Sequence, residues 1–534
     1  MAETIQQLLA QRAEQDGPAV LHQTADGGQL RWTWRQYLDR ATRHAAALLG
    51  RADTDRPVHV GALLGNTPAM LTALAGAALG GYVLCGVNGT RRGSALAGDL
   101  RTADVQILLV DAEHRGLLAG LDLAGISVID VDDPAWARAC AEAGALTPHR
   151  QVTAMDPFVM IFTSGTSGDP KAVLVNHFMV LVAGQNLTER FGLGPADVAY
   201  LSMPLFHSNA IVAGFAPAVA SGAAMALAKF SASRFLSDIR CYGATYMNYV
   251  GKPLAYVLAH PEQPDDADNP LRVAFGNEGS DRDIAEFSRR FSTQVVDAFG
   301  STENAVIITR EEGTPPGSVG RGLPGVAVYC SDPVGPCPPA RFDATGALVN
   351  PDEAIGELVN TTGSGFFSGY YNNESATAER LRHGMYWSGD LAYADDDGWI
   401  YLAGRTADWM RVDGENLAAA PIERILLRHN DISQVAVYAV PDGNVGDQVM
   451  AALVLRDDAG LSPADFVEFL AAQEDLSPKA WPRYVRISAE LPMTATNKIL
   501  KRSLAAQGTD VGADTLWVRP DRERSYRKTT GAEL

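Results

Sequence analysis

The segment from residue 158 to residue 175 constrains the fold most, because two apolar runs enclose a short polar loop. The runs Phe158–Phe162 and Ala172–Val175 each have the length and apolar character of a buried strand. The loop reads Thr163, Ser164, Gly165, Thr166, Ser167, Gly168, Asp169, Pro170 and Lys171. Its glycines let the backbone approach a ligand closely, and its hydroxyls and lysine can donate hydrogen bonds. The segment therefore predicts a hairpin whose loop suits a polyphosphate.

The same loop has two other interpretations. A surface turn rich in serine, threonine and glycine has this composition without binding a ligand. A nucleotide-binding P-loop, G-x-x-x-x-G-K-S/T, is disfavoured because Lys171 follows Asp169 and Pro170 and the loop precedes a strand rather than a helix. Composition alone leaves the surface turn and the phosphate site open.

Length and charge limit the remaining possibilities. A chain of 534 residues exceeds the usual size of one hydrophobic core, so we expect at least two domains. The formal net charge of -19 argues against nucleic acid as a partner, because phosphate backbones are bound by basic surfaces. A soluble acidic protein is the expected class.

Cysteine usage and the first residues bear on the cellular compartment. The cysteines are few, odd in number and not in C-x-x-C spacing, so neither a disulfide framework nor a zinc site is indicated. The segment Met1–Asp16 lacks the basic and apolar regions of a signal peptide. We therefore expect free thiols and a cytoplasmic location. The cysteines are Cys85, Cys140, Cys241, Cys330 and Cys337.

One uncharged segment, Gly61–Thr90, is the only candidate for a membrane span. Its helical portion, Ala69–Leu79, is shorter than the ~20 apolar residues that a bilayer requires. We expect a buried helix there and no transmembrane span. Peripheral contact with a membrane stays open, as does the oligomeric state, for which a homodimer is one possibility.

The order of strand-like and helix-like segments predicts an α/β protein with parallel sheets covered by helices. Glycine and aromatic residues become more frequent after Ile355, which indicates a β-rich subdomain. We place a domain boundary near Asp408. The expected division is a large layered α/β domain over residues 1–407, a small mobile α+β domain over 408–508 and a polar tail over 509–534.

Polar residues follow several of these strand-like segments, and open α/β sheets bind ligands where strands end. His207 follows such a segment, and Leu271–Gly279 is a strand that runs into a turn. Each also has an ordinary structural interpretation, because a lone histidine is more often structural and a glycine after a strand often marks a turn. Asp390 and Arg405, taken singly, would form a surface ion pair.

Taken together, the motifs resemble the adenylate-forming superfamily of acyl-CoA synthetases, luciferases and adenylation domains. The segment Thr163–Lys171 is similar to that family's signature Thr-Ser-Gly, two hydroxyl residues, Gly, any residue, Pro and Lys. Within the superfamily, Phe230–Phe235, Tyr249–Gly251 and Arg411–Asn416 look most like the fatty-acid transport protein and very-long-chain acyl-CoA synthetase subgroup. The resemblance extends over nearly the whole chain and implies ATP, Mg²⁺ and CoA as ligands.

The resemblance also implies roles for residues of the large domain. The loop Thr163–Lys171 would hold phosphates, and His207 would border the carboxylate pocket. Glu303 would help to hold Mg²⁺ with Thr166, and Thr302 would meet the α-phosphate. The residues implied to lie against adenine are Gly276, Asn277, Glu278, Phe299 and Gly300. Asn304 departs from the glycine common in relatives and places a polar group beside the expected acyl pocket.

Further roles are implied near and beyond the expected boundary. Asp390 and Arg405 would bind the ribose, and Arg405 also a phosphate. Asp408 matches the hinge, and Lys498 aligns with the mobile lysine that reaches the carboxylate and the α-phosphate. Gly414 and Glu415 belong to the element that lines the thiol tunnel. The chain departs from its relatives at Ala407 and Asn497, where lysine and glycine are usual, and Lys501 is an alternative cation.

Electrostatics explains why a cation is needed. A carboxylate brought to ~4 Å from a phosphate oxygen costs on the order of 4 kcal/mol per pair of unit charges at an effective dielectric near 20. Mg²⁺ on Glu303 and the ammonium of Lys498 would offset much of that cost.

The leading hypothesis is an ATP-dependent ligase that activates a fatty or other apolar acid as an acyl-adenylate and then forms a CoA thioester. The alternative keeps the adenylation and changes the substrates, to an aromatic acid or to nitrite attacked by an aryl amine. A non-catalytic lipid-binding module is the third possibility, and the presence of Glu303 and Lys498 argues against it.

Overall fold

The computed structural model of the chain divides into two compact units, each described here separately. The first comprises Met1–Ala305 with Ser364–Leu381, and the second Val306–Gly363 with Arg382–Leu534. The described residues are 2–24, 27–163, 170–251, 253–344, 346, 348–405, 409–412, 415–442, 446–456, 460–473, 476, 478–493, 499–520 and 523–529.

Two sheets form the framework of the first unit. One contains strands in the order β13, β12, β11, β9, β10, β1 and β2, and the other in the order β6, β5, β3, β4, β7 and β8. The pairings are parallel except β1 with β2 and β7 with β8. Their bounds are β1 (Pro18–Gln23), β2 (Gln29–Thr33), β3 (His59–Leu63), β4 (Val83–Gly86), β5 (Ile107–Val110), β6 (Ser127–Asp130), β7 (Pro157–Thr163), β8 (Lys171–Asn176), β9 (Val198–Leu201), β10 (Ala224–Leu227), β11 (Tyr246–Val250), β12 (Val273–Asn277) and β13 (Gln294–Gly300).

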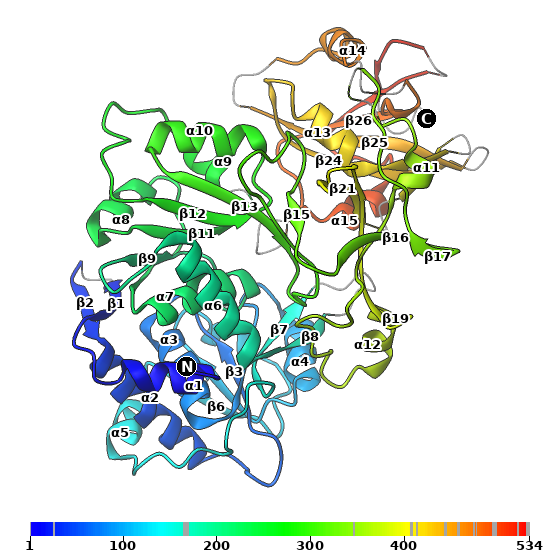
Figure 1. Cartoon of the computed structure of the whole chain (residues 1–534). Coiled ribbons are helices and arrows are strands. Elements are labelled where there is room, and N and C mark those ends of the chain that lie inside the picture. Colours follow the sequence, from blue (N-terminus) through cyan, green and yellow to red (C-terminus); the bar gives the residue numbers. More distant parts are fainter. Residues whose placement is uncertain are drawn as a thin grey trace. The chain divides into compact units, whose positions relative to one another are not determined.

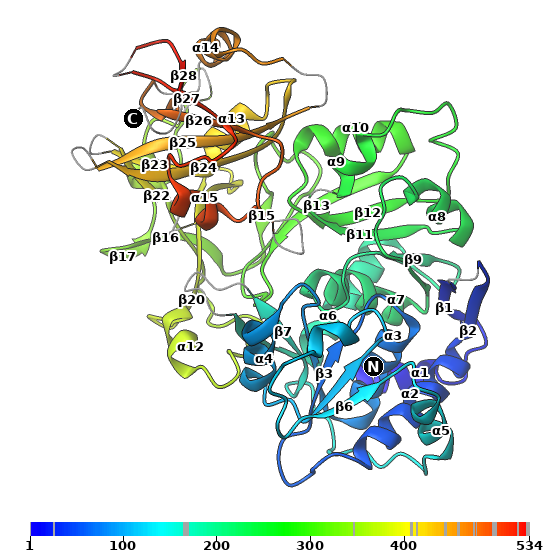
Figure 2. The same ribbon diagram turned by 180° about the vertical axis from the view of Figure 1, so that it is seen from behind.

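Helices cover both faces of the sheet that contains β11, as Figures 1 and 2 show, with α8, α9 and α10 on one side and α6 and α7 on the other. On the first side Phe235, Leu254 and Phe287 join one apolar cluster with Tyr200. The helices are α1 (Ile5–Arg12), α2 (Trp34–Leu49), α3 (Pro68–Gly80), α4 (Gly93–Thr102), the 3₁₀ helix η1 (Arg115–Leu118), α5 (Pro134–Glu142), α6 (His177–Phe191), the π-helix η2 (Ala210–Phe215), α7 (Ala216–Ser221), α8 (Phe235–Tyr242), α9 (Pro253–Leu258), α10 (Asp281–Phe291) and α12 (Glu374–Arg380).

Local sequence explains where the first long helices begin. Thr33 caps α2 by accepting a hydrogen bond from the backbone N–H of Gln36, whose side-chain oxygen in turn accepts one from the Thr33 N–H. Helix α3 has proline at its first position and ends before Gly81, whose φ of 68° lies in the left-handed region that favours glycine. The helical portion of the uncharged segment is therefore the buried helix α3, as its length predicts. No helix of the described residues is long and apolar enough to cross a membrane.

The second unit contains two further sheets and an antiparallel pair of short strands, Ile307–Thr309 with Arg321–Gly322. The strands are β14 (Ile307–Thr309), β15 (Arg321–Gly322), β16 (Val326–Ser331), β17 (Val334–Pro336), β18 (Gly356–Asn360), β20 (Met385–Ala394), β21 (Ile400–Arg405), β22 (Trp409–Val412), β23 (Glu415–Ala418), β24 (Ile432–Asp442), β25 (Gly446–Leu455), β26 (Tyr484–Ser488), β27 (Thr515–Val518) and β28 (Arg527–Thr529), with β19 (Leu381–Arg382) at the boundary. The helices are α11 (Pro351–Ala354), α13 (Ala419–Leu426), α14 (Pro463–Ala471), the 3₁₀ helix η4 (Pro478–Ala480) and α15 (Lys501–Gln507).

The C-terminal sheet is buried on both faces. Alternate residues of β24 enter different apolar clusters, Val435 and Val437 on one face and Ala436 and Tyr438 on the other. The segment after residue 508, for which the sequence indicated a polar tail, supplies β27 and β28 to this sheet. Its Trp517 is only 2% exposed and packs in the same apolar cluster as Val435 and Val437. This packing stabilises the segment against the sheet.

The cysteines are free thiols, as their number and spacing predict. The hairpin of β16 and β17 brings Cys330 and Cys337 together, with 2.7 Å between the two Sγ atoms. Burial raises the pKa of the Cys337 thiol, and the hydrogen bond with Cys330 raises it further. The Cys337 thiol is therefore protonated at neutral pH.

Candidate active site

The strands that flank the polar loop pair as a β-hairpin, as the sequence predicts. Strands β7 and β8 pair antiparallel, and their register places Thr163 opposite Lys171. The Lys171 side chain is only 9% exposed, which is unusual for a lysine and requires nearby partners. The remaining loop residues of the candidate site, Ser164, Gly165, Thr166, Ser167 and Gly168, lie outside the described residues.

Tyr370 connects the hairpin lysine with the predicted metal-binding carboxylate. Its hydroxyl donates a 2.7 Å hydrogen bond to Oε1 of Glu303, and its ring centroid lies 5.1 Å from Nζ of Lys171. Burial, and then the charge of Glu303, raise the pKa of the Tyr370 hydroxyl, so it stays protonated and donates. A second carboxylate, Oε2 of Glu379, lies 3.8 Å from Nζ of Lys171. Tyr370 therefore contacts a cation through its ring and an anion through its hydroxyl.

Tyr370 was not among the residues that the sequence predicts for the site. It follows Gly369, and the only local signal is an aromatic pair with Tyr371 in a glycine-rich segment. Tyr370 and Glu303 are separated by 67 positions, so spacing along the chain gives no indication that they meet.

The predicted adenine-facing turn begins where β12 ends. Gly276 and Asn277 close the strand, and Glu278 adopts a φ of 65°, a left-handed conformation uncommon outside glycine and typical of functional turns. The Asp297 carboxylate supports the turn from β13, because Oδ1 accepts hydrogen bonds from the Gly279 backbone at 3.2 Å and from the Tyr249 hydroxyl at 2.6 Å. Asp297 and Tyr249, both buried, therefore support the turn.

Gly276 leaves no room for a side chain. A Cβ at this position would lie 2.3 Å from the backbone oxygen of Tyr249 on β11. We predict that Gly276→Ala lowers the free energy of unfolding by about 1–3 kcal/mol, because the overpacked strand must shift, and raises the KM for the nucleotide several-fold. Thermal unfolding and initial-rate kinetics measure both effects. Gly194→Ala is the control, since a Cβ there meets nothing within 4 Å. An unchanged midpoint for Gly276→Ala would contradict this close packing.

The end of β13 brings further predicted residues to the same unit. Phe299 and Gly300 end the strand, and Thr302 shares a 3.1 Å hydrogen bond with Ser208. Asn304 has a φ of 48°, and its Nδ2 lies 3.8 Å from the sulfur of Met179. Thioether sulfur is a weak acceptor, so this amide retains hydrogen-bonding capacity for another group.

His207 follows β9, on a segment fixed by an asparagine from the loop between β3 and α3. The Asn66 side chain accepts from the Leu205 backbone at 3.0 Å and donates to the Met203 carbonyl at 2.8 Å. The His207 backbone donates to the Pro204 carbonyl at 3.0 Å, which closes a turn. The Ser208–Thr302 contact then ties this segment to the residue before Glu303. His207, Thr302 and Glu303 therefore belong to one connected region.

The remaining predicted residues belong to the second unit. Asp390 on β20 is buried and pairs in register with Arg405, the last residue of β21. The backbone of the preceding Gly389 donates a 2.6 Å hydrogen bond to Glu357, which fixes the strand beside Asp390. Glu415 begins β23. Asp408, Gly414 and Lys498 lie outside the described residues.

Glu303 is the described residue that fits a magnesium ion. Mg²⁺ keeps several waters and is usually bound by one or two carboxylates together with substrate phosphates, so a dedicated protein cage is not required. The described residues contain no group of three or more histidine, cysteine, aspartate or glutamate side chains that could form such a cage. A single buried carboxylate with one oxygen held by Tyr370 is consistent with phosphate-assisted binding.

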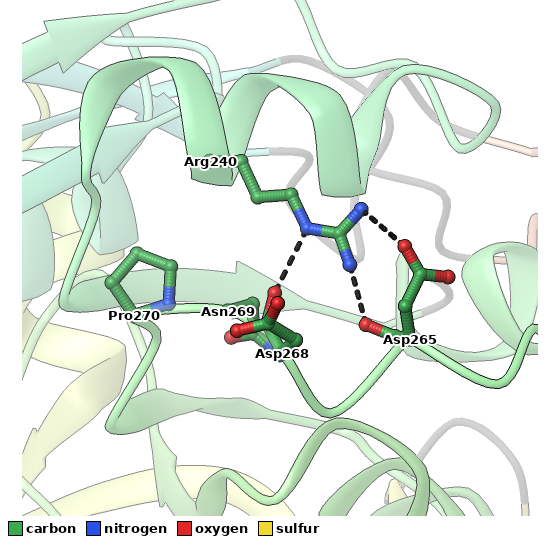
Figure 3. A pocket seen from close by; sticks show the side chains of 5 residues that line it. All are labelled: Arg240, Asp265, Asp268, Asn269 and Pro270. Atoms are coloured by element: carbon green, nitrogen blue, oxygen red, sulfur yellow. Dashed lines mark hydrogen bonds and ion pairs between the residues drawn. The ribbon is translucent and has the colours of Figure 1, made fainter.

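The first unit also has a surface pocket, which is lined by residues that are not among the predicted site residues. Arg240 projects from α8 towards the loop that precedes β12, and its Nε donates a 2.9 Å hydrogen bond to the Asp268 carbonyl (Figure 3). Its Nη1 lies 3.1 Å from Oδ2 of Asp265, so the guanidinium is satisfied by the loop itself. The pocket is formed by a surface loop that Arg240 holds in place, and it is not a second reactive site.

Comparisons with known proteins give the family context. The AMP-binding enzyme family matches residues 9–371, and the AMP-binding enzyme C-terminal domain matches residues 421–498. The medium/long-chain-fatty-acid--CoA ligase FadD17 of Mycobacterium tuberculosis is 52% identical over 91% of this chain and 93% of its own. The steroid-22-oyl-CoA synthetase of Rhodococcus jostii is 45% identical over 94% and 91%. Long-chain fatty acid transport protein 2 of Rattus norvegicus is 31% identical over 70% and 63%.

Solved structures agree on the fold. ATP-bound MatB from Rhodopseudomonas palustris superposes with a TM-score of 0.80, covering 95% of this chain and 99% of MatB at 22% identity. The predicted α/β class, with a large N-terminal and a smaller C-terminal domain, is thereby confirmed.

Proposed function

Because this chain belongs to the AMP-binding enzyme family, we propose that it joins a large apolar acid, such as a fatty acid, to CoA through an acyl-adenylate. The chain is an ATP-dependent acid–CoA ligase. Two relatives, 52% and 45% identical to this chain, carry the names of ligases for medium- and long-chain fatty acids and for a steroid acid. Both names describe bulky, largely hydrocarbon acids, and this shared property defines the substrate class.

The observation that carries the proposal is the group formed by Lys171, Tyr370 and Glu303. It places a buried ammonium group near the ring of Tyr370 and a carboxylate at the hydroxyl of the same residue. Lys171 suits the phosphates of ATP, and Glu303 suits the Mg²⁺ that accompanies them. When bound there, Mg²⁺ would reduce the negative charge on the phosphates.

The reaction has two steps. A carboxylate oxygen of the acid attacks the α-phosphorus of ATP, and the bond to the β-phosphate oxygen breaks to release pyrophosphate. The sulfur of CoA then attacks the acyl carbon, loses its proton and displaces AMP. Thr302 would orient the α-phosphate, Lys498 would approach it as the acid attacks, and His207 would border the acid.

The remaining roles are proposed from the family's motifs. Phe299, with the Gly276–Glu278 turn, would receive the adenine, and Asp390 with Arg405 would bind the ribose. Residues 408–508 would rotate about Asp408 between the two steps, so that Gly414 and Glu415 line the path of CoA in the second. A cytoplasmic location is proposed because both ATP and CoA are supplied there.

A substrate panel tests the proposed function. We predict that ATP, CoA and saturated or steroid acids give AMP, pyrophosphate and acyl-CoA in equal amounts, with rates at least tenfold above those for acetate or benzoate. Nitrite with an aryl amine is included as the alternative oxyanion. Formation of ADP, or pyrophosphate release that requires nitrite and ignores CoA, would contradict the proposal.

A further inference from the structure

Three side-chain amides form a continuous chain of hydrogen bonds in the first unit. Nδ2 of Asn248, on β11, donates to Oδ1 of Asn209 at 2.6 Å. Nδ2 of Asn209 donates to Oδ1 of Asn277 at 3.0 Å, and Nδ2 of Asn277 donates to the Ala298 carbonyl at 2.6 Å. All three donors point in the same direction, so each amide polarises the next.

The series of amide hydrogen bonds begins beside a π-helix. The π-helix Ala210–Phe215 starts directly after Asn209, and π-helical turns occur frequently at functional sites. Strand β11 bonds to it through Tyr246 and packs closely against it at Asn248. The Tyr246 hydroxyl donates a 2.7 Å hydrogen bond to the Ala213 carbonyl, and Oδ1 of Asn248 lies 3.0 Å from where a Cβ of Gly214 would be.

Asn248 is completely buried, and its Oδ1 has no hydrogen-bond partner among the described residues. Burying an amide with one group unpaired costs about 1–3 kcal/mol, so a purely structural position would be better filled by an apolar side chain. The amide instead contributes its donor to Asn209. Asn248 thus fixes the orientation of Asn209 at the cost of an unpaired oxygen.

The hydrogen-bonded amides connect segments that the proposed reaction uses. Asn209 lies two residues after His207, Asn277 belongs to the adenine-facing turn, and Ala298 precedes Phe299. The turn itself has a separate support, because Asp297 and Tyr249 hold Gly279 independently of the amides. Loss of the amide chain should therefore displace His207 relative to the turn while leaving the turn in place.

We propose that Asn248 and Asn209 are positioning residues for the adenylation step, which set the His207 segment and the π-helix against the nucleotide-binding turn. The inference rests on the proposed function, since it assigns the acid to the His207 side and ATP to the turn. Neither asparagine needs to touch a substrate. Their effect is carried by the hydrogen bonds from β11 to β13.

Acid-dependent pyrophosphate exchange tests this role in the full-length protein. For Asn248→Leu, which removes the donor and keeps the branched shape of the side chain, kcat should fall at least tenfold while the KM for ATP stays within twofold of wild type. Asn209→Ala is the second variant, because Asn209 is only half-buried and its loss endangers folding less. The double variant should be no slower than the slower single variant, because both changes break one chain.

Asn269→Ala is the matched control. Asn269 also donates two hydrogen bonds, to the Asp266 carbonyl at 2.7 Å and the Phe291 carbonyl at 3.0 Å, but it lies at the surface pocket of Figure 3. It should lower the thermal midpoint and leave kcat unchanged.

Two results would overturn the positioning role: a kcat within twofold of wild type in both asparagine variants, or a KM for ATP that rises as kcat falls. If wild type itself shows no acid-dependent exchange, the proposed function fails instead, so the two failures are distinguishable.

Discussion

Replacing Glu303 by glutamine is expected to lower acid-dependent pyrophosphate exchange by about 10²–10³-fold. Glutamine keeps the oxygen that accepts from Tyr370, so the 2.7 Å hydrogen bond can persist while the negative charge is lost. The change therefore removes the metal-binding charge with little alteration of shape. The half-saturating concentration of Mg²⁺ should rise as well, and a magnesium titration of the exchange rate measures both effects.

Tyr370→Phe provides the comparison for this prediction. It removes the hydroxyl and retains both the Glu303 charge and the ring beside Lys171. We expect a fall of about tenfold or less, because a hydrogen bond to a charged group contributes roughly 1.5–3 kcal/mol and water can replace part of it. Exchange by Glu303→Gln within fivefold of wild type, with an unaltered magnesium dependence, would show that Glu303 does not hold the metal.

Replacing Lys498 by alanine is expected to reduce adenylation by about 10²–10³-fold and to spare the second step. A carboxylate and a phosphate oxygen at ~4 Å repel by on the order of 4 kcal/mol at an effective dielectric of 20, and each ~1.4 kcal/mol corresponds to a factor of ten. Conversion of a synthetic acyl-adenylate and CoA to thioester should continue at close to the wild-type rate. Separate assays of the two half-reactions measure this difference.

Lys501→Ala is the control for the lysine prediction. Nζ of Lys501 lies 2.7 Å from Oε1 of Glu423 within the second unit, so this side chain already has a structural partner. Its removal should change adenylation less than threefold. Equal losses for the two lysines, or a loss confined to thioester formation, would remove Lys498 from the proposed adenylation step.

Local pattern was sufficient to predict the framework that carries the site. The apolar runs that flank Thr163 and Lys171 predict the hairpin, and β7 and β8 place these two residues opposite each other. Helix α2 buries residues three or four positions apart, such as Trp34, Tyr37 and Ala41, and this spacing is visible in the sequence itself. In both elements, the information lies in residues a few positions apart, where periodicity and capping determine conformation.

The contacts that join the site residues could not be predicted in this way. Glu303 meets Tyr370 across 67 positions, and Asn209 meets Asn277 across 68. Hydrogen bonds between distant side chains leave no periodic signal, because each depends on how whole strands are ordered in a sheet. The sequence indicates that Leu516–Val518 could dock but not where, since a short apolar run in a polar segment joins a sheet only when a neighbouring strand is available.

The central claim is that the acid attacks the α-phosphorus of ATP before CoA attacks the acid. The most direct measurement uses an apolar acid labelled with ¹⁸O in its carboxyl group, with ATP and CoA, and follows the label by mass spectrometry. The mechanism predicts one labelled oxygen in each AMP, because the bond between that oxygen and the acyl carbon breaks when the thioester forms. Label in inorganic phosphate, or AMP without label, would contradict it.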